Sequence, residues 1–532
     1  MNKIDYSVFA GGSSLFHDYI NSFPKTADLY AGDPYNKDSF RAQISKVSKK
    51  DYRRDGLIDI LAKQNINESN SGMIQPLLDK LSEPRSCAVV TGQQAGLFLG
   101  PLYTVYKALT AVKLAEEIES SSGVPVVPVF WIEVDDHDFD EVRKFSVLSP
   151  SGEARKIEYD DGIEGMLPVW KRRLGDSFED ILNDISEIFG DTDNARSTIE
   201  TLSGIFKAGK SMPEVFREFF RAYFPDVPLL FINPSDPEIK EIAKPFFRDV
   251  ISRRGEVEKV LTDQNNVLES NGYKPQVEIR EGIIRLFNFN GVERKRLTPG
   301  SLGEGEGAVS EFVEQNFRGL SGDVLTRPLL QDYLLPTIAY VAGPSELAYM
   351  GQLKKLYGFL GINMPVIYPR WSGTLIDVKT GRNIEQLGFE VSDFIKHTEK
   401  EILEKIFSEK DTGEYDGIFE RTNVELQANL DDIKELAEKI DKSLVSMVDS
   451  QGNKLKFQVD KIRDKVMNAL KNSDKQVQEK CRRISSTIMP GGKPQERVFS
   501  VLNYLVRYGS EFPELLIEKI NTETDKHHIV EI

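Results

Sequence analysis

Cysteine is scarce in this sequence: the 532 residues include only Cys87 and Cys481. Neither has a second Cys or a His nearby at the spacing of metal ligands, so we expect no structural zinc site. The chain also lacks a cleavable signal pattern and any apolar run long enough to span a bilayer. Together these absences predict a protein of the reducing cytoplasm that does not enter a membrane.

Basic charge is scarce too. The formal net charge is -16 at pH 7, whereas a protein that grips nucleic acid needs a basic surface to neutralise phosphates. We therefore exclude nucleic acid as the main partner, while anionic small molecules remain possible where basic residues gather locally. The length exceeds the roughly 250 to 300 residues at which one hydrophobic core stops growing, so we expect more than one structural unit.

The common nucleotide-binding motifs are missing from the most distinctive segment, TGQQAGLFLGP at residues 91–101. A Walker loop needs a Lys-Ser/Thr pair directly after its last glycine, and the dinucleotide fingerprint needs Gly-x-Gly-x-x-Gly. The segment still follows a short apolar run, residues 87–90, and precedes an apolar-periodic run from Leu102 to about Ile118. This order predicts a strand, a glycine-rich loop and a helix with Pro101 in its first turn.

We interpret the glycine-rich loop as a ligand site. Gly92, Gly96 and Gly100 allow the backbone to approach a ligand closely, and the helix that follows offers unpaired N–H groups to an anion. The polar side chains predicted to contact a substrate here are Thr91, Gln93 and Gln94. The alternative is that the two glutamines hydrogen-bond the loop to itself.

Four further apolar runs end in polar turns: residues 129–132, 227–232, 338–341 and 364–368. Strands that alternate with helices predict an α/β fold with a mostly parallel sheet, covered on both faces. In such a sheet the loops at the carboxyl ends of the strands gather at one edge. We therefore expect the glycine-rich loop, the acidic loop after residue 132, residues 343–346 and Arg370 to converge.

Two long insertions interrupt the predicted core, at about residues 142–225 and 238–325. The second contains a predicted hairpin of residues 276–280 and 283–287, separated by Glu281-Gly282.

From about residue 395 the composition changes to charged residues spaced by regular aliphatics. The aliphatic positions are Leu426, Leu430, Ile433, Ala437, Ile440, Leu444 and Met447, and then Leu455, Val459, Ile462, Val466 and Ala469. This heptad seam predicts a coiled coil. Turn-forming residues at 441–443 and 449–453 favour an antiparallel helical hairpin, with one uninterrupted helix as the alternative. Heptads alone do not say whether the seam pairs within the chain or between chains.

The acidic loop supplies the catalytic candidates. His137 lies between Asp136 and Asp138 at the end of a predicted strand. A histidine flanked by carboxylates can have a raised pKa and act as a general base, or the carboxylates can hold magnesium beside phosphates. The alternative is a solvated acidic turn that caps the next helix.

Further candidates for substrate binding are Tyr103, Lys107, Arg327, Gln331, Asp332, Glu346, Tyr349 and Arg370. The planar guanidinium of Arg327 suits a carboxylate or phosphate, although a pair between Arg327 and Asp332 is equally compatible with the sequence. Glu346 alternatively complements a helix dipole, and Lys107 and Arg370 are alternatively ordinary surface charges.

The segment of residues 490–497 is a further candidate for binding a cofactor phosphate, through Gly491, Lys493 and Arg497. A simple turn explains it as well. The amphipathic run of residues 498–508 that follows is predicted to dock back on the core.

Six motifs together resemble the family of cysteine-adding enzymes of bacillithiol biosynthesis. They are residues 91–104, 136–140, 272–277, 327–332, 339–346 and 494–497, in an order that spans nearly the whole chain. The resemblance implies a Rossmann-like core with connecting-peptide insertions (residues 1–390), a helical coiled-coil arm used in dimerisation (391–489) and a C-terminal segment that returns to the core (490–532).

The resemblance also implies a ligase that joins L-cysteine to the amine of glucosaminyl malate. ATP, with or without Mg²⁺, would activate the cysteine carboxylate as an adenylate or acyl phosphate, and His137 would remove the amine proton while Asp136 or Asp138 orients it. The His-x-Gly-His and Lys-Met-Ser-Lys-Ser motifs of class I adenylating sites are absent, and Gly100-Pro-Leu-Tyr103 stands in place of the first. The alternative function is a nucleotide-binding dimeric scaffold of the same pathway without ligase activity.

Overall fold

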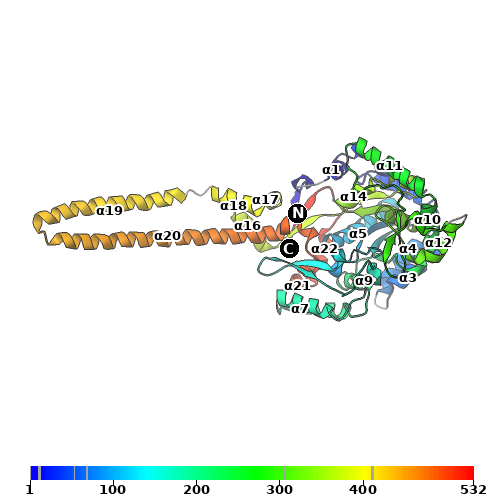
Figure 1. Cartoon of the computed structure of the whole chain (residues 1–532), viewed down its shortest axis with the longest axis horizontal. Helices are drawn as coiled ribbons and strands as arrows, with labels where there is room; N and C mark the ends of the chain where they lie inside the picture. The colour runs from blue at the N-terminus through cyan, green and yellow to red at the C-terminus, as the bar shows by residue number, and fades with distance from the viewer. Residues whose placement is uncertain (1, 10–12, 53, 68–69, 304–306, 409–411) are drawn as a thin grey trace. The chain divides into compact units, whose positions relative to one another are not determined.

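The structure is a computed structural model that describes residues 2–9, 13–52, 54–67, 70–303, 307–408 and 412–532. It consists of two units, Met1–Ile376 with Lys493–Ile532 and Asp377–Gly492 (Figure 1). The boundary between them lies after Ile376, earlier in the chain than the predicted boundary at residue 390. Within the described ranges, no helix is both long and apolar enough to cross a membrane.

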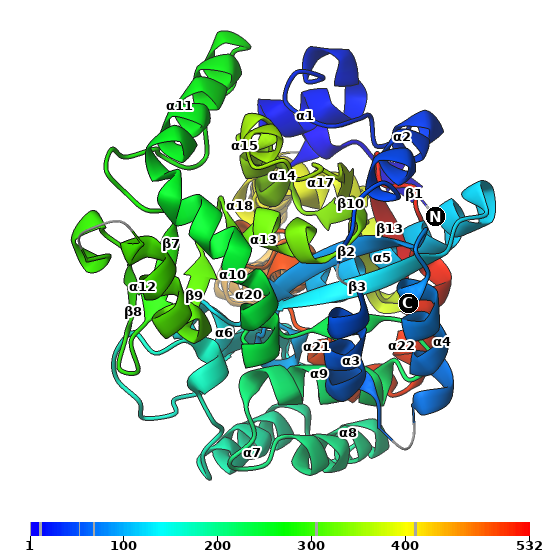
Figure 2. The same cartoon turned by 90° about the vertical axis from the view of Figure 1, so that its right-hand side faces the viewer.

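A five-stranded parallel sheet forms the centre of the first unit (Figure 2). The strand order is β11-β10-β2-β3-β6. The strands are β2 (Cys87–Gln94), β3 (Val126–Glu133), β6 (Leu230–Ile232), β10 (Thr337–Ala342) and β11 (Val366–Pro369). They read as continuous apolar runs because both faces of the sheet are buried. The predicted α/β fold is therefore confirmed.

Helices cover both faces of this sheet. Ala88 and Val90 of β2 belong to one hydrophobic cluster and Cys87 and Val89 to another, as the two-residue period of a strand requires. The first cluster includes residues of α3 (Arg54–Asn65), α4 (Ser71–Ser82), α10 (Pro237–Ser252), α13 (Arg327–Leu334) and α14 (Pro344–Met350). The other face is covered by α5 (Tyr103–Ser122) and α2 (Lys37–Val47).

The glycine-rich loop is part of the core and not an open phosphate cradle. Strand β2 continues to Gln94, and residues 95–100 are buried. Phe98 and Leu99 have left-handed φ angles of 50° and 67°, a strained conformation that persists where packing fixes it. The ring of Phe98 packs against those of Phe145, Phe178, Phe206 and Phe219. Pro101, predicted inside the first turn of the helix, instead lies before α5 and bridges to Ser500.

The glycines of this loop serve chain packing. A Cβ on Gly96 would lie 2.9 Å from the Cα of Gly100, so the loop could not fold back on itself with a larger residue. A Cβ on Gly92 would lie 2.8 Å from the carbonyl oxygen of Trp131 on β3. Gly96 and Gly100, predicted to approach a ligand, are instead buried against protein.

The insertions form smaller layers of the first unit. The first contains the hairpin of β4 (Lys144–Leu148) and β5 (Ala154–Glu158), and α7 (Phe178–Phe189), α8 (Asp193–Ile205) and α9 (Met212–Tyr223). The second contains α11 (Arg254–Ser270), α12 (Ala308–Asn316) and an antiparallel sheet of order β8-β7-β9, with β7 (Leu286–Phe289), β8 (Arg294–Arg296) and β9 (Leu320–Gly322).

The predicted hairpin of residues 276–280 and 283–287 is wrong. The Oε1 of Gln352 accepts the backbone N–H groups of Gln276 and Val277 at 3.0 Å each, and its Nε2 donates to the carbonyl oxygen of Val277 at 2.9 Å. A buried side chain therefore takes the bonds that a partner strand would have made.

The C-terminal segment after Gly492 belongs to the first unit. It contains α21 (Leu502–Tyr508), α22 (Glu511–Lys519) and β13 (His527–Glu531). Strand β13 lies between β1 (Asn2–Ile4) and β12 (Gly373–Ile376), antiparallel to β1 and parallel to β12.

The second unit contains an antiparallel helical hairpin, α19 (Thr412–Ile440) and α20 (Leu444–Ile488) (Figure 1). Its other helices are α16 (Val378–Gln386), α17 (Val391–Lys396) and α18 (Glu399–Ser408). The turn lies at residues 441–443, the first of the two predicted positions. A Cβ on Gly452 would lie 2.9 Å from a methyl carbon of Leu430, so the second candidate turn is instead a close contact between the helices.

We expect Gly92→Ala to destabilise the first unit by about 1–3 kcal/mol, because the new methyl group collides with the backbone of β3. Gly204→Ala in α8 is the matched control, since nothing lies within 4 Å of its Cβ position, and it should leave stability unchanged or raise it slightly. Thermal and urea unfolding followed by circular dichroism compares them. Equal stability of the two variants would contradict the packing role of Gly92.

Candidate functional site

A cavity of about 460 Å³ opens at the carboxyl ends of the central strands; we call it the edge cavity. It is lined by Gly92, Gln93, Gln94, Glu133, Asp136, His137, Glu141, Phe287, Arg294, Arg296, Gly322, Asp323, Val324, Arg327, Tyr340, Glu346 and Tyr349. The glycine-rich segment, the acidic loop and the start of α14 therefore converge as the parallel sheet predicted. Arg370 is not among the lining residues.

A buried ion pair forms the floor of this edge. The ammonium of Lys107 on α5 lies 2.6 Å from Oε2 of Glu346 on α14, and it also donates to the carbonyl oxygen of Gly92 and to Oε1 of Gln93. Burial lowers the pKa of Lys107. Burial alone would raise the pKa of Glu346, but the charge and hydrogen bond of Lys107 bring it below its usual value, so the pair is ionised.

The predicted role of Lys107 needs correction. An ammonium has three donors, and all three are used by Gly92, Gln93 and Glu346. Lys107 is also only 1% exposed. It therefore holds the residues that line the edge cavity and does not itself contact a substrate anion.

Arg327 enters the edge cavity from the first turn of α13. Its Nη1 donates to Oε1 of Gln331 at 3.1 Å, and its Nη2 donates to the hydroxyl of Tyr340 at 3.4 Å. Behind it, Gln331 donates to Asp332 at 2.9 Å and Tyr357 donates to the other carboxylate oxygen at 2.5 Å. The predicted substrate contacts of Gln331 and Asp332 are wrong, because both are buried outside the cavity, where they orient Arg327.

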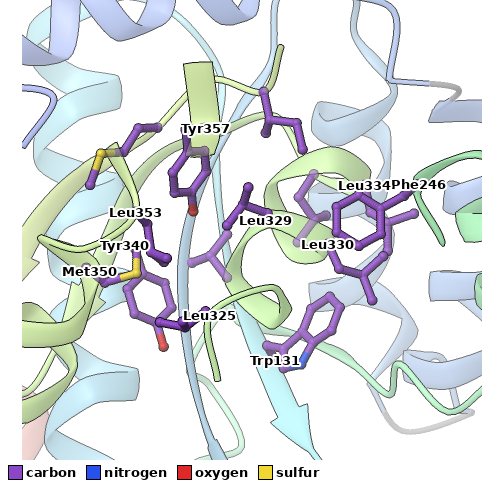
Figure 3. Close-up of a cluster of buried hydrophobic side chains, with 14 of the residues drawn as sticks. Trp131, Phe246, Leu325, Leu329, Leu330, Leu334, Tyr340, Met350, Leu353 and Tyr357 are labelled. Carbon is purple, nitrogen blue, oxygen red and sulfur yellow. The ribbon is translucent and has the colours of Figure 1, made fainter. Parts of the chain in front are cut away.

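The apolar side of α13 anchors this chain of hydrogen bonds. Figure 3 shows Leu329, Leu330 and Leu334 packed among Trp131, Phe246, Tyr340 and Tyr357. Because the helix is fixed on that side, the guanidinium of Arg327 at its start has a defined position.

The acidic loop divides into residues that face the edge cavity and one that does not. Nη1 of Arg294 lies 3.2 Å from Nδ1 of His137 and 3.2 Å from Oδ1 of Asp136, while Asp136 lies 3.4 Å from Nδ1. Nδ1 of His137 thus faces both a guanidinium, which can only donate, and a carboxylate, which can only accept. Asp138 is exposed and caps α6 (Phe139–Val142), accepting the N–H of Glu141 at 3.2 Å. Asp138 is therefore in the capping position and not beside the imidazole.

Three other predicted contacts are structural. Arg370 is 5% exposed and pairs with Glu496 at 2.5 Å. Its guanidinium lies 5.3 Å from the ring centroid of Tyr103, whose hydroxyl accepts from Gln93 at 3.3 Å. The buried hydroxyl of Thr91 donates to the carbonyl oxygen of Val341 at 2.9 Å and ties β2 to β10. Arg370 and Thr91 therefore stabilise the carboxyl edge of the sheet through contacts with protein.

The last cofactor candidates lie elsewhere. Gly491, with a φ of 59°, Lys493 and Arg497 are exposed, and none of the three lines the edge cavity formed by the described residues. Gly491 falls in the second unit and Lys493 in the first.

Four charged residues that line the edge cavity were not predicted from the sequence: Arg294, Arg296, Asp323 and Glu141. Arg294 and Arg296 alternate on β8, and Asp323 follows β9, so all three come from the second insertion. Glu141 lines the cavity from α6, and burial raises the pKa of its carboxyl, assisted by the charges of Asp138 and Asp136. The alternation of Arg294 and Arg296 was the only signal, and it did not indicate where the insertion folds.

Two family models cover the chain. One, described as "Bacillithiol biosynthesis BshC, N-terminal Rossmann-like domain", matches residues 1–371, and the other, described as "Bacillithiol biosynthesis BshC, C-terminal coiled-coil domain", matches residues 373–532.

Curated relatives are similar over nearly their whole length. A Salinibacter ruber protein is 31% identical over 530 residues, covering 97% of this chain and 96% of the relative. Proteins of Geobacillus thermodenitrificans and Geobacillus kaustophilus are each 30% identical, covering 98% and 97% of this chain and 98% of either relative. All three bear the name "Putative cysteine ligase BshC".

We expect Asp332→Asn to remove a pH dependence of stability between about pH 4 and 6. Burial raises the pKa of Asp332 to about 6 from an ordinary 3.8, so the folded state holds its proton longer than the unfolded state does. Below the pKa of Asp332 in the unfolded chain, its protonated carboxyl contributes its full share to the free energy of unfolding. That contribution, about 3 kcal/mol, is lost as the pH rises through the pKa of Asp332 in the folded protein. Urea unfolding of both proteins at pH 4, 5, 6 and 7 measures the difference. A constant difference across that range would contradict the assignment.

Proposed function

The chain belongs to the bacillithiol biosynthesis BshC family, and on that premise we propose that it joins L-cysteine to glucosaminyl malate through an amide bond, in the last step of bacillithiol biosynthesis. The relatives named as cysteine ligases support the reaction class. The observation that carries the proposal is the edge cavity, where guanidinium groups and carboxylates face one space.

The charge pattern of the edge cavity suits the two substrates. Arg296 and Arg327 present guanidinium groups, whose planar forks bind carboxylates such as those of malate. Arg296 is 37% exposed in its side chain and pairs with Asp323 at 3.2 Å. Glu133 and Asp136 line the same cavity, and we propose that their carboxylates receive the ammonium of cysteine.

We assign the proton transfer to Glu141. The glucosamine nitrogen attacks the activated carboxyl carbon of cysteine, a C–N bond forms, the bond to the leaving oxygen breaks, and one proton leaves the nitrogen. Glu141 accepts it because its carboxylate lines the edge cavity, and its raised pKa makes it a better base than an ordinary carboxylate. His137, proposed from the sequence as the base, lines the same cavity beside Asp136 and is the second candidate for this proton transfer.

ATP is the proposed co-substrate, and it would supply a good leaving group on the carboxyl oxygen. One of the two guanidinium groups, Arg296 or Arg327, then binds phosphate oxygens while the other binds the malate carboxylates. Gly96 and Gly100 are buried against protein, so their backbone does not contact the phosphates in this proposal. A cytoplasmic location belongs to the same proposal, since Cys87 and Cys481 are free thiols.

A homodimer through the helical hairpin is also proposed. Ala437 is buried in the seam, whereas Ile433, Ile440, Met447 and Ile462 are 52–71% exposed. Such a row of exposed aliphatics on long helices favours a second copy as the partner. The same observation favours the alternative function, a dimeric scaffold that binds nucleotide without forming product.

We expect His137→Ala and Glu141→Gln each to lower kcat/KM by about 100-fold or more in a reaction reconstituted with cysteine, glucosaminyl malate and ATP. Asp138→Asn is the matched control and should stay within roughly twofold, because Asn caps a helix as well as Asp. The kcat/KM of the wild type should rise as the pH rises through the raised pKa of Glu141, since the base must be ionised. The kcat/KM of Glu141→Gln should not show this rise. Full activity of Glu141→Gln would remove its role.

We expect the double variant Leu436→Asp, Ile440→Asp to sediment as a monomer at concentrations where the wild type is a dimer, with a dissociation constant raised about 100-fold or more. Both side chains are exposed, at 59% and 71%, so the single chain should still fold. Val292→Asp, 77% exposed in the first unit, is the control. A monomeric wild type in analytical ultracentrifugation would contradict the proposal.

A further inference from the structure

A second cavity of about 680 Å³ lies beyond β6, the edge strand next to β3; we call it the side cavity. Asn233, Ser235 and Asp236, which follow β6, line it together with the start of α9, at Ser211 to Glu214. Trp170 and Phe289 form its aromatic wall, with ring centroids 5.9 Å apart. None of these residues belongs to the edge cavity.

Positive charge gathers in the side cavity. The cations that line it are Lys63, Lys171, Arg173, Arg217 and Arg318, against the carboxylates Glu214 and Asp236. The chain as a whole has a net charge of -16, so this local excess runs against the background. It favours an anionic ligand.

Arg217 is the most informative of these cations. It is half-buried on α9, and burial lowers the pKa of its guanidinium. By contrast, Arg173 pairs with Glu214 at 3.3 Å and Lys63 with Glu238 at 2.7 Å. Among the described residues, Arg217 has no hydrogen-bond or ion-pair partner. A half-buried guanidinium that lines a cavity and has no protein acceptor can bind a ligand anion through charge-assisted hydrogen bonds.

The aromatic wall indicates what accompanies the charge. The ammonium of Lys171 lies 4.6 Å from the ring centroid of Trp170 and 5.8 Å from that of Phe289. An indole and a phenyl ring offer flat apolar surface to a base or to a sugar ring, while the nearby cation binds the attached anionic group. Charge and aromatic surface together specify an anion that carries a ring.

The side cavity is connected to the acidic loop through the backbone. The N–H of Trp170 donates to the carbonyl oxygen of Val134 at 3.1 Å, and the N–H of Val169 donates to that of Asp136 at 2.8 Å. On β7, Phe287 lines the edge cavity and Phe289, two residues later, lines the side cavity. One strand and one loop thus separate the two spaces.

We infer that the side cavity is a second ligand site, for an anion that carries a ring, with Arg217 binding the anionic group and Trp170 contacting the ring. The inference rests on the proposed function, which supplies two candidate ligands of this kind: a nucleoside triphosphate and the sugar-linked dicarboxylate.

Tryptophan fluorescence of the full chain tests the site directly. Trp131 and Trp371 are fully buried, so Trp170 reports on the side cavity. The protein is titrated with ATP and with glucosaminyl malate, to find which of the two candidate ligands binds. Inorganic triphosphate and L-malate, which carry the same anionic groups without a ring, show how much the ring contributes to binding. We expect one ring-bearing ligand to change the emission, its ringless counterpart to bind at least tenfold more weakly, and Trp170→Phe to lose the optical change.

Calorimetry on variants locates the binding. Arg217→Gln should weaken it about tenfold or more, as the loss of a charge-assisted hydrogen bond implies, and Arg318→Gln, at an exposed position, should weaken it without risk to folding. Arg280→Gln, 71% exposed outside both cavities, should match the wild type. Arg327→Gln should abolish product formation but leave this binding intact.

Two results would overturn the side cavity as a site. One is binding that survives Arg217→Gln and Arg318→Gln but is lost in Arg327→Gln, which would place the ligand in the edge cavity and leave the proposed function standing. The other is no binding of either ring-bearing ligand to the wild type. Binding that requires Arg217 in a protein that never yields product would instead support the side cavity and refute the ligase.

Discussion

The buried ion pair between Lys107 and Glu346 is the interaction on which the site depends. It joins α5 to α14, helices that follow the neighbouring strands β2 and β10. The ammonium also holds the Gly92 carbonyl, and the carboxylate accepts the N–H of Gly343 at 2.9 Å and the hydroxyl of Tyr340 at 2.8 Å. Loss of Glu346 would leave the charge of Lys107 buried without its carboxylate partner, at a cost of about 3–5 kcal/mol. The pair thus fixes the sheet edge before a ligand arrives.

The opposite wall is built by the inserted sheet β8-β7-β9. The guanidinium of Arg294 lies 3.8 Å from the ring centroid of Phe287 and bonds to Asp136, so the insertion is tied to the acidic loop. The central sheet therefore holds the loops of the edge cavity in place, and the insertion contributes many of the charged side chains that line it. This division explains how a chain with none of the common nucleotide motifs still presents a cavity rich in ionisable groups.

The central strands and their convergence could be predicted from the sequence, because apolar runs that end in polar turns define a parallel sheet, whose carboxyl edge gathers the loops. The roles of Lys107 and Asp332 could not, since a charged side chain contacts either ligand or protein depending on partners distant in the chain. Glu346 lies 239 residues from Lys107. The hairpin prediction failed for the same reason, because Gln352, 75 residues away from Val277, takes its backbone bonds. Arg294 and Arg296 depend on how an insertion folds, which local pattern does not encode.

Mass spectrometry of a reconstituted reaction tests the central claim most directly. Purified protein would be incubated with cysteine, glucosaminyl malate and ATP, with Arg327→Gln and Arg280→Gln run alongside. We predict the amide product with the wild type and Arg280→Gln, and its loss with Arg327→Gln. Product formed equally by Arg327→Gln, or none formed by the wild type, would contradict a ligase site in the edge cavity.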